Sequence, residues 1–200
     1  MKRRWIIGTV VLFSSLILIC GCGKDEKPPK PTVQDLINQG WTKFDAGKYA
    51  GASADFNAAI GMSVDTNEAY LGLGWAELRQ SHGGLAENAF AAYLLKVTDT
   101  NDDAKAGLAF AYHAQQKFQN AIDTANIVLL SVPNWKFSHD SRIDSLDLAL
   151  ILAQSYYGIG DYSQSLVVYQ RYFDHNFNPD INTDAGREEL ADKIESKYTG

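Results

Sequence analysis

The residues with the most reactive side chains are two cysteines, Cys20 and Cys22, which stand at the end of an uncharged apolar stretch. A closed zinc site needs four ligands, and the sequence offers no further cysteine and no histidine before His82. A disulfide between residues two apart would be strained, because the Cα separation and the Cβ directions rarely suit so small a ring. The spacing therefore argues against a metal site and against a disulfide.

The segment that carries the cysteines has the three parts of a secretory signal sequence. Residues 2–4 are basic, residues 5–23 carry no charge, and the small residue Gly21 precedes Cys22. The alternative is an uncleaved membrane anchor, because an uncharged stretch of this length just suffices to span a bilayer. Both interpretations place the remainder of the chain outside the cytoplasmic membrane, since the basic residues stay on the inner side.

Residues 19–22, with the sequence ICGC, resemble the cleavage signal of bacterial lipoproteins. That signal has an aliphatic residue three positions before the modified cysteine and a glycine or alanine directly before it, a pattern that Cys22 fits and Cys20 does not. The resemblance implies that residues 1–21 are a lipoprotein signal peptide and that Cys22 carries fatty acids such as palmitate. In an organism with two membranes, Gly23 in place of aspartate implies the periplasmic face of the outer membrane.

The charge balance excludes one class of partner. The chain has 18 basic and 24 acidic residues, and removal of residues 1–21, which hold three basic and no acidic groups, leaves 15 against 24, a net charge of −9. Binding to nucleic acid needs clustered lysine and arginine, so no nucleic-acid partner is expected. Residues 22–32 are polar and proline-rich, a composition that predicts a flexible tether.

From residue 33 onward the chain contains degenerate repeats. Residues 47–60 and 160–173 align without gaps: each begins with glycine and then has an aromatic residue at plus two, a small residue at plus five and an aromatic residue at plus nine. Residues 116–129 follow the same frame, and residues 71–78 align with residues 106–113, 35 positions later. Periods of this length indicate a stack of repeated helical units.

These spacings resemble the tetratricopeptide repeat, a helical hairpin of about 34 residues. The resemblance implies an all-α, right-handed superhelical stack of about four hairpins over residues 33–180, with a C-terminal capping helix over residues 181–200. Two helix starts are predicted from capping-box spacing, one at Thr32 with Asp35 and one at Ser141 with Asp144.

No arrangement in the sequence proposes a reaction. The four histidines lie in four separate stretches without a second ligand at helical spacing, so neither a metal site nor a cofactor is expected. The letters SHDSR at residues 138–142 are no evidence for a catalytic triad, because such triads are assembled in space. A binding protein is therefore predicted in preference to an enzyme.

In tetratricopeptide proteins the first helix of each hairpin lines a concave groove, and the ninth and twelfth positions of each repeat point into it. Large side chains at these positions form a ladder along the predicted groove: Trp41, Phe44, Trp75, Leu78, Phe110, His113 and Tyr157. The residues that pack the helices of this repeat against one another stand at other positions, so packing does not require these large side chains. The ladder therefore favours an apolar or helical segment of a partner protein as ligand. The alternative is that a tight superhelix or the C-terminal helix buries the ladder.

Residues 134–141 are extra to the repeat pattern and contain Trp135 and Phe137. These rings either cover the junction between two hairpins or form a contact surface. The sequence as a whole predicts a membrane-anchored repeat lipoprotein that acts as a protein-interaction scaffold in a bacterial cell-envelope assembly. A lipoprotein receptor for a small ligand or a glycan is the alternative.

Overall fold

The computed structural model describes residues 30–96 and 101–198, and the compact unit that contains the helices begins at Pro31. The predicted signal peptide, Cys22 and most of the predicted tether lie outside the described residues. The described residues form nine α-helices, a terminal 3-10 turn (Ser196–Tyr198) and no strand. The helices are α1 (Val33–Asp45), α2 (Tyr49–Met62), α3 (Asn67–Leu78), α4 (Gly83–Lys96), α5 (Asp102–Ala114), α6 (Phe118–Ser131), α7 (Ser145–Gly158), α8 (Tyr162–Tyr172) and α9 (Asp184–Glu195).

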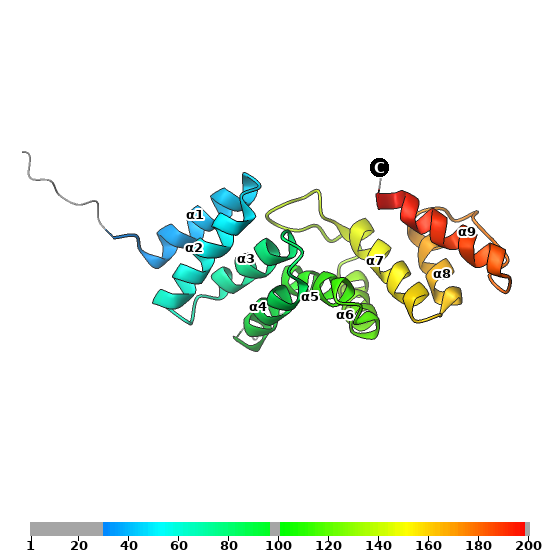
Figure 1. The fold of residues 1–200 in the computed structure, drawn as a ribbon, viewed down its shortest axis with the longest axis horizontal. Helices are drawn as coiled ribbons and strands as arrows, with labels where there is room; N and C mark the ends of the chain where they lie inside the picture. Colours follow the sequence, from blue (N-terminus) through cyan, green and yellow to red (C-terminus); the bar gives the residue numbers. More distant parts are fainter. Residues whose placement is uncertain (1–29, 97–100, 199–200) are drawn as a thin grey trace, which may run out of the picture. The chain divides into compact units, whose positions relative to one another are not determined.

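The first eight helices pair in order along the chain and stack as four helical hairpins (Figure 1). Each second helix also contacts the first helix of the next hairpin, and α1, α3, α5 and α7 contact one another in sequence along one face of the stack. The all-α hairpin architecture predicted from the repeats is therefore confirmed. None of the helices in the described part of the chain combines the length and the apolar character that crossing a bilayer requires.

Close approach of the helices depends on small residues opposite large ones. The ring of Phe56 lies between α1 and α3, and a Cβ atom added to Gly40 or Gly72 would come within 2.6 Å or 2.3 Å of it. Phe90 occupies the equivalent place in the next hairpin, between Gly74 and Gly107. The glycines therefore leave room for the buried rings of Phe56 and Phe90. Helix α3 packs against both rings, which is why it has glycine at residues 72 and 74.

The turns inside the hairpins require a left-handed backbone conformation. Gly47 and Gly160 have φ angles of 71° and 81°, as expected for the glycine at that place in the repeat. The second and third hairpins use Ser81 and Gln116 instead, with φ angles of 64° and 58°. A side chain at such a φ angle is strained, so hairpin packing imposes the turn on these two residues.

One of the two predicted helix starts is confirmed and the other is wrong. Thr32 and Asp35 form a capping box at the start of α1. The fourth hairpin begins later than Ser141 predicts, because Asp144 is the N-cap of α7 and forms its capping box with Asp147. Ser141 lies instead in a loop, in which the amide of Phe137 donates to the carbonyl of Ile143 at 2.9 Å.

The C-terminal helix closes the end of the stack. Helix α9 contacts α7 and α8, and it buries Leu190 and Ile194 against them. The side chain of Thr183 accepts a hydrogen bond from the amide of Gly186 and so caps the helix start. Burial of the apolar face of the last hairpin is the role expected of a capping helix.

Candidate protein-binding groove

The predicted ladder lies on the first helices of the hairpins, as its positions require, but it divides into two groups. Trp41, Phe44 and Trp75 are buried, with exposed fractions of 7%, 3% and 2%. The other four members, Leu78, Phe110, His113 and Tyr157, are partly exposed. The ladder is therefore internal in its N-terminal part and open to solvent farther along.

The loop between α6 and α7 covers the buried part of the ladder. Phe137 lies over Trp75 with ring centroids 4.0 Å apart and planes 22° apart, and Trp135 lies nearly parallel to Trp75 at 6.4 Å. The ring of His139 stacks on Trp41 at 3.4 Å. We define residues 133–143 as the covering loop. The covering element is thus neither the tight superhelix nor the C-terminal helix, the two elements that the alternative interpretation of the ladder named.

Both aromatic residues singled out in the extra segment are core residues. Trp135 is 3% exposed and Phe137 is 1% exposed. They pack on first-helix residues of the earlier hairpins, so the interpretation that these rings cover neighbouring hairpins is closer to the structure than an exposed contact surface.

Two carboxylates hold indole groups in the covered part of the groove. Trp135 donates through Nε1 to Asp103 at 2.8 Å, and the same carboxylate accepts from the amide of Ser138 at 3.2 Å. Trp41 donates through Nε1 to Glu68 at 3.2 Å. The indole Nε1 of Trp75 is different, because it is buried and has no hydrogen-bond partner. An unpaired buried donor of this kind costs about 1 to 3 kcal/mol.

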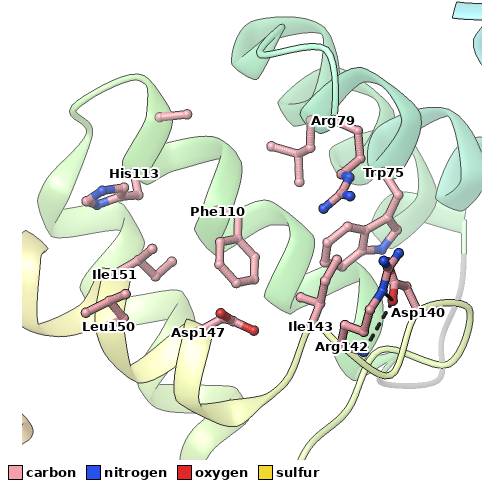
Figure 2. Close-up of a pocket in the computed structure, with 12 residues that line it drawn as sticks. Trp75, Arg79, Phe110, His113, Asp140, Arg142, Ile143, Asp147, Leu150 and Ile151 are labelled. Carbon is pink, nitrogen blue, oxygen red and sulfur yellow. Dashed lines mark hydrogen bonds and ion pairs between the residues drawn. The ribbon is translucent and has the colours of Figure 1, made fainter. Parts of the chain in front are cut away.

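Beside the covering loop the groove remains open as a cavity of about 500 Å³ (Figure 2). Helices α3, α5 and α7 supply most of its walls. The covering loop and Arg79, which directly follows α3, supply the rest. The apolar lining is Trp75, Leu78, Phe110, Ala114, Ile143, Leu150 and Ile151, and the polar lining is Arg79, His113, Asp140, Arg142 and Asp147. An apolar floor with a few polar groups at its margin is the usual composition of a binding site.

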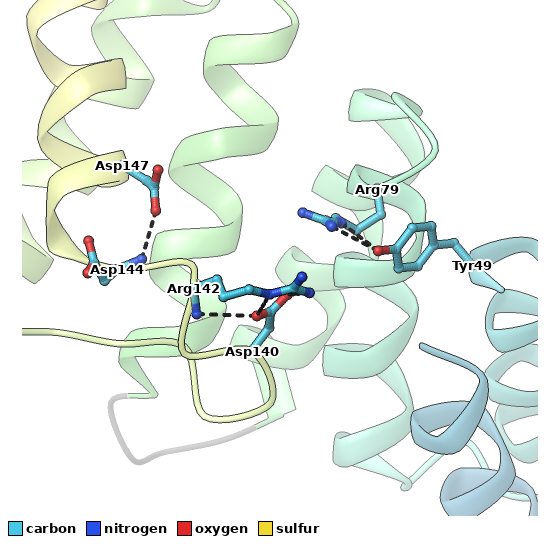
Figure 3. A network of polar contacts seen from close by, with 6 residues as sticks. All are labelled: Tyr49, Arg79, Asp140, Arg142, Asp144 and Asp147. Atoms are coloured by element: carbon cyan, nitrogen blue, oxygen red, sulfur yellow. Dashed lines mark hydrogen bonds and ion pairs between the residues drawn. The ribbon is translucent and has the colours of Figure 1, made fainter. Parts of the chain in front are cut away.

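Two arginines stand at one margin of this cavity (Figures 2 and 3). Arg142 forms a two-bonded ion pair with Asp140, in which both distances are 2.8 Å, and this contact lowers the pKa of Asp140. Arg79 instead donates through Nε and Nη2 to the hydroxyl of Tyr49, at 3.0 Å and 2.8 Å. The guanidinium of Arg79 therefore brings a positive charge to the margin, with the hydroxyl of Tyr49 as its hydrogen-bond acceptor.

Burial shifts the pKa values of two titratable groups on the other side of the cavity. Burial raises the pKa of Asp147, although the amide of Asp144 donates to its carboxylate at 2.9 Å (Figure 3). Burial also lowers the pKa of His113, whose Nδ1 lies 3.0 Å from the hydroxyl of Ser155. This side of the cavity thus suits an apolar group better than a second charged one.

Two kinds of site come into question for the polar residues of the cavity, a metal site and a histidine–serine pair. Within residues 30–96 and 101–198, no three histidine, cysteine or acidic side chains lie close enough to bind an ion. His113 pairs with Ser155, but this serine is completely buried and its hydroxyl donates to the carbonyl of Ile151, so it does not face a substrate.

The structure separates the predicted site residues into three places. Leu78, Phe110 and His113 line the open cavity together with Trp75, which Phe137 also covers, while Trp41 and Phe44 lie beneath the covering loop. Tyr157 lines a separate depression between α7 and α9, together with Gln154 and Ile194 among others. The prediction that these residues bind a partner remains a prediction, and only four of the seven share the open cavity.

Several lining residues were absent from the predicted site. Leu150 occupies the fifth position of the fourth repeat, which points into the groove in this family, so the repeat frame could have identified it. Asp140, Arg142 and Ile143 had no signal in the sequence, because they reach the cavity only through the path of the loop.

Comparison with known proteins agrees with this architecture. Residues 37–103 match the tetratricopeptide repeat family. A structure described as MamA MSR-1 C2 is similar to this chain, with a TM-score of 0.58 and 16% identity over 82% of this chain and 79% of that one. A thermophilic repeat protein of Thermus thermophilus gives a TM-score of 0.56 and 16% identity, covering 82% of this chain and 83% of its own.

The first repeat domain of human RPAP3 is also similar, with a TM-score of 0.53 and 17% identity over 67% of this chain and 97% of that domain. A search among curated proteins found no significant match. At these identities the solved structures establish the fold alone. The chain therefore has the tetratricopeptide repeat fold, and residues 37–103 carry the sequence pattern of that family.

Proposed function

We propose that this chain is a membrane-anchored lipoprotein that acts as a protein-interaction scaffold in a bacterial cell-envelope assembly. The observation that carries the proposal is the cavity on the concave face of a repeat stack whose fold serves protein–protein interaction. Its walls come from first helices of three successive hairpins, so a ligand there contacts several repeats at once.

The lining supports an apolar side chain of a partner protein as the group that enters the cavity. Phe110, Leu150 and Ile151 offer apolar surface, and Arg79 and Arg142 stand at one margin. A helical segment could place an apolar residue on this floor and direct an acidic residue three or four positions away toward the arginines. The site thus favours an amphipathic segment over a uniformly charged one.

The anchor part of the proposal rests on the pattern around Cys22. The ten residues that follow this cysteine, 23–32, end at the N-cap of α1, and an extended proline-rich tether of roughly 3 Å per residue reaches roughly 30 Å. Several acyl chains on one cysteine give firm attachment, because each buried methylene contributes about 0.8 kcal/mol. A scaffold on such a tether can meet partners near the membrane surface.

Site-specific photo-crosslinking in the producing bacterium tests the binding surface. A benzoylphenylalanine in place of Phe110 should yield an adduct with one defined envelope protein. The same group in place of Tyr70, which lines a different depression between α3 and α4, should not yield that adduct. Identical adducts at both positions would contradict binding in the groove. Absence of any protein adduct, with a small molecule retained on the purified chain, would favour a ligand receptor.

A further inference from the structure

Residues 135–137 of the covering loop form a short extended segment on the groove, and turns at residues 138–139 and 141–142 follow it. The side chains of Trp135 and Phe137 enter the groove and His139 stacks at its edge, whereas Lys136 and Ser138 between them are exposed. Over residues 135–137 this alternation is what an extended chain produces when one of its faces is buried, whereas His139 reaches Trp41 from the turn that follows. The loop therefore presents aromatic groups at every second position to the first helices of the stack.

The groove holds this segment through side chains. The main-chain hydrogen bonds of the loop run within it and to its flanks, such as the amide of Phe137 to Ile143 and the amide of Ser145 to Trp135. The contacts to the groove include ring contacts with Trp41, Phe44 and Trp75 and the two hydrogen bonds accepted by Asp103. A separate peptide with the same alternating aromatic residues could make all of these contacts.

The fit between loop and groove is incomplete at one point. The indole Nε1 of Trp75 is buried and has no acceptor, whereas Trp41 and Trp135 each have a carboxylate partner. Buried donors are normally paired, so the covered groove offers one binding contact that the loop leaves unused. A ligand that brings a carbonyl or carboxylate oxygen to Trp75 would complete this contact.

We propose that the N-terminal half of the groove is a binding site for an extended protein segment with aromatic side chains at alternate positions, and that residues 133–143 are its built-in competitor. The proposal rests on the proposed function in one respect, that the concave face binds protein segments. The partner displaces the loop, places its own rings on Trp41 and Trp75, and extends from there into the open cavity beside Phe110.

The attachment of the loop at both ends determines how tightly a partner must bind to displace it. Both ends of the loop continue into helices, α6 and α7, so the loop competes at an effective concentration in the millimolar range. A partner that repeated only the contacts of the loop would lose this competition. The partner must therefore gain from contacts that the loop lacks, such as an acceptor for Trp75 and an apolar group in the open cavity.

A labelled peptide with the sequence of residues 133–143, PNWKFSHDSRI, tests the proposal in a fluorescence polarisation assay with the full chain in detergent. The double variant Trp135→Ala/Phe137→Ala vacates the groove, and it should bind the peptide at least tenfold more tightly than the unmodified chain does. A control peptide with alanine at both aromatic positions should bind neither protein. The milder variant Phe137→Leu, which retains an apolar side chain, should show a smaller gain in affinity.

Three outcomes would overturn the proposal. The first is that both variants keep their helical circular dichroism and bind the peptide no better than the unmodified chain. The second is equally tight binding of the peptide to all three proteins, because the loop would then not be a competitor. The third is loss of helical structure in both variants, which would make the loop part of the core. None of these results depends on the lipid anchor or on a crosslink at position 110, so failure of the proposed scaffold function is a separate result.

Discussion

The ring of His139 lies parallel to the indole of Trp41, with centroids 3.4 Å apart and planes 3° apart. This contact joins the loop before the fourth hairpin to the first helix of the first hairpin. Burial of the ring lowers the pKa of His139, and the carboxylates of Glu68, Asp103 and Asp45 oppose that shift. We therefore expect the contact between loop and groove to depend on pH.

The first prediction is that the domain loses stability as the pH falls from about 7.5 to about 5. Because the folded pKa of His139 lies below its ordinary value of 6.5, the unfolded chain binds the proton more readily. The stabilisation is complete above the ordinary value and is lost as the pH falls toward the folded pKa. His113, whose pKa is also lowered by burial, acts in the same direction.

The variant His139→Phe isolates the contribution of this loop residue, since it keeps a ring on Trp41 and removes the proton. Its melting temperature, followed by circular dichroism, should depend less steeply on pH than that of the unmodified chain. If the melting temperatures of the two proteins depended on pH equally steeply, protonation of His139 would not be a cause of the loss of stability.

The second prediction separates the two parts of the ladder. Trp75 is buried under Phe137, so Trp75→Ala should lower the free energy of unfolding by about 3 to 5 kcal/mol. Phe110 is only partly buried, so Phe110→Ala should cost less stability and should weaken partner binding by on the order of 2 kcal/mol. Urea unfolding and a pull-down of the crosslinked partner measure the two effects. Equal losses of stability would argue that Phe110 belongs to the core.

The third prediction concerns the glycine that admits Phe56. A methyl group at residue 72 would lie 2.3 Å from the ring, so Gly72→Ala should destabilise the domain by about 1 to 3 kcal/mol. The matched control is Gly61→Ala in α2, where an added Cβ atom meets nothing within 4 Å. That change should be neutral or stabilising, because alanine favours a helix over glycine by about 0.5 to 1 kcal/mol. Thermal unfolding that ranks the two variants the other way would refute this account of the packing.

The fourth prediction tests the lipid anchor. Cys22→Ser should abolish incorporation of a labelled fatty acid and leave the precursor uncleaved, whereas Cys20→Ser should change neither result. The reason is that Cys22 alone has glycine before it and an aliphatic residue three positions before it. Gel analysis after metabolic labelling gives both readouts, and label that persists in the Cys22→Ser chain would rule out the lipoprotein interpretation.

The repeat architecture could be predicted from the amino-acid sequence, because the contacts that define it recur at fixed spacing. The positions of Gly47, Gly160 and the small residues opposite Phe56 and Phe90 follow from hairpin geometry, in which each helix meets the next one along the chain. The period therefore predicted the helices, the turns and the face on which the ladder lies. The start of α7 was the exception, since Ser141 and Asp144 have the spacing of a capping box without forming one.

Which part of the groove is open depends on contacts between distant segments. Phe137 meets Trp75 and His139 meets Trp41 across 62 and 98 positions of the chain, and the loop that carries them has no counterpart in the other repeats. Because such contacts depend on the path of a single irregular segment, no periodic pattern encodes them. The same path brings Arg142 to the cavity that Arg79 also lines, so the charge at its margin arises from the fold and not from a motif.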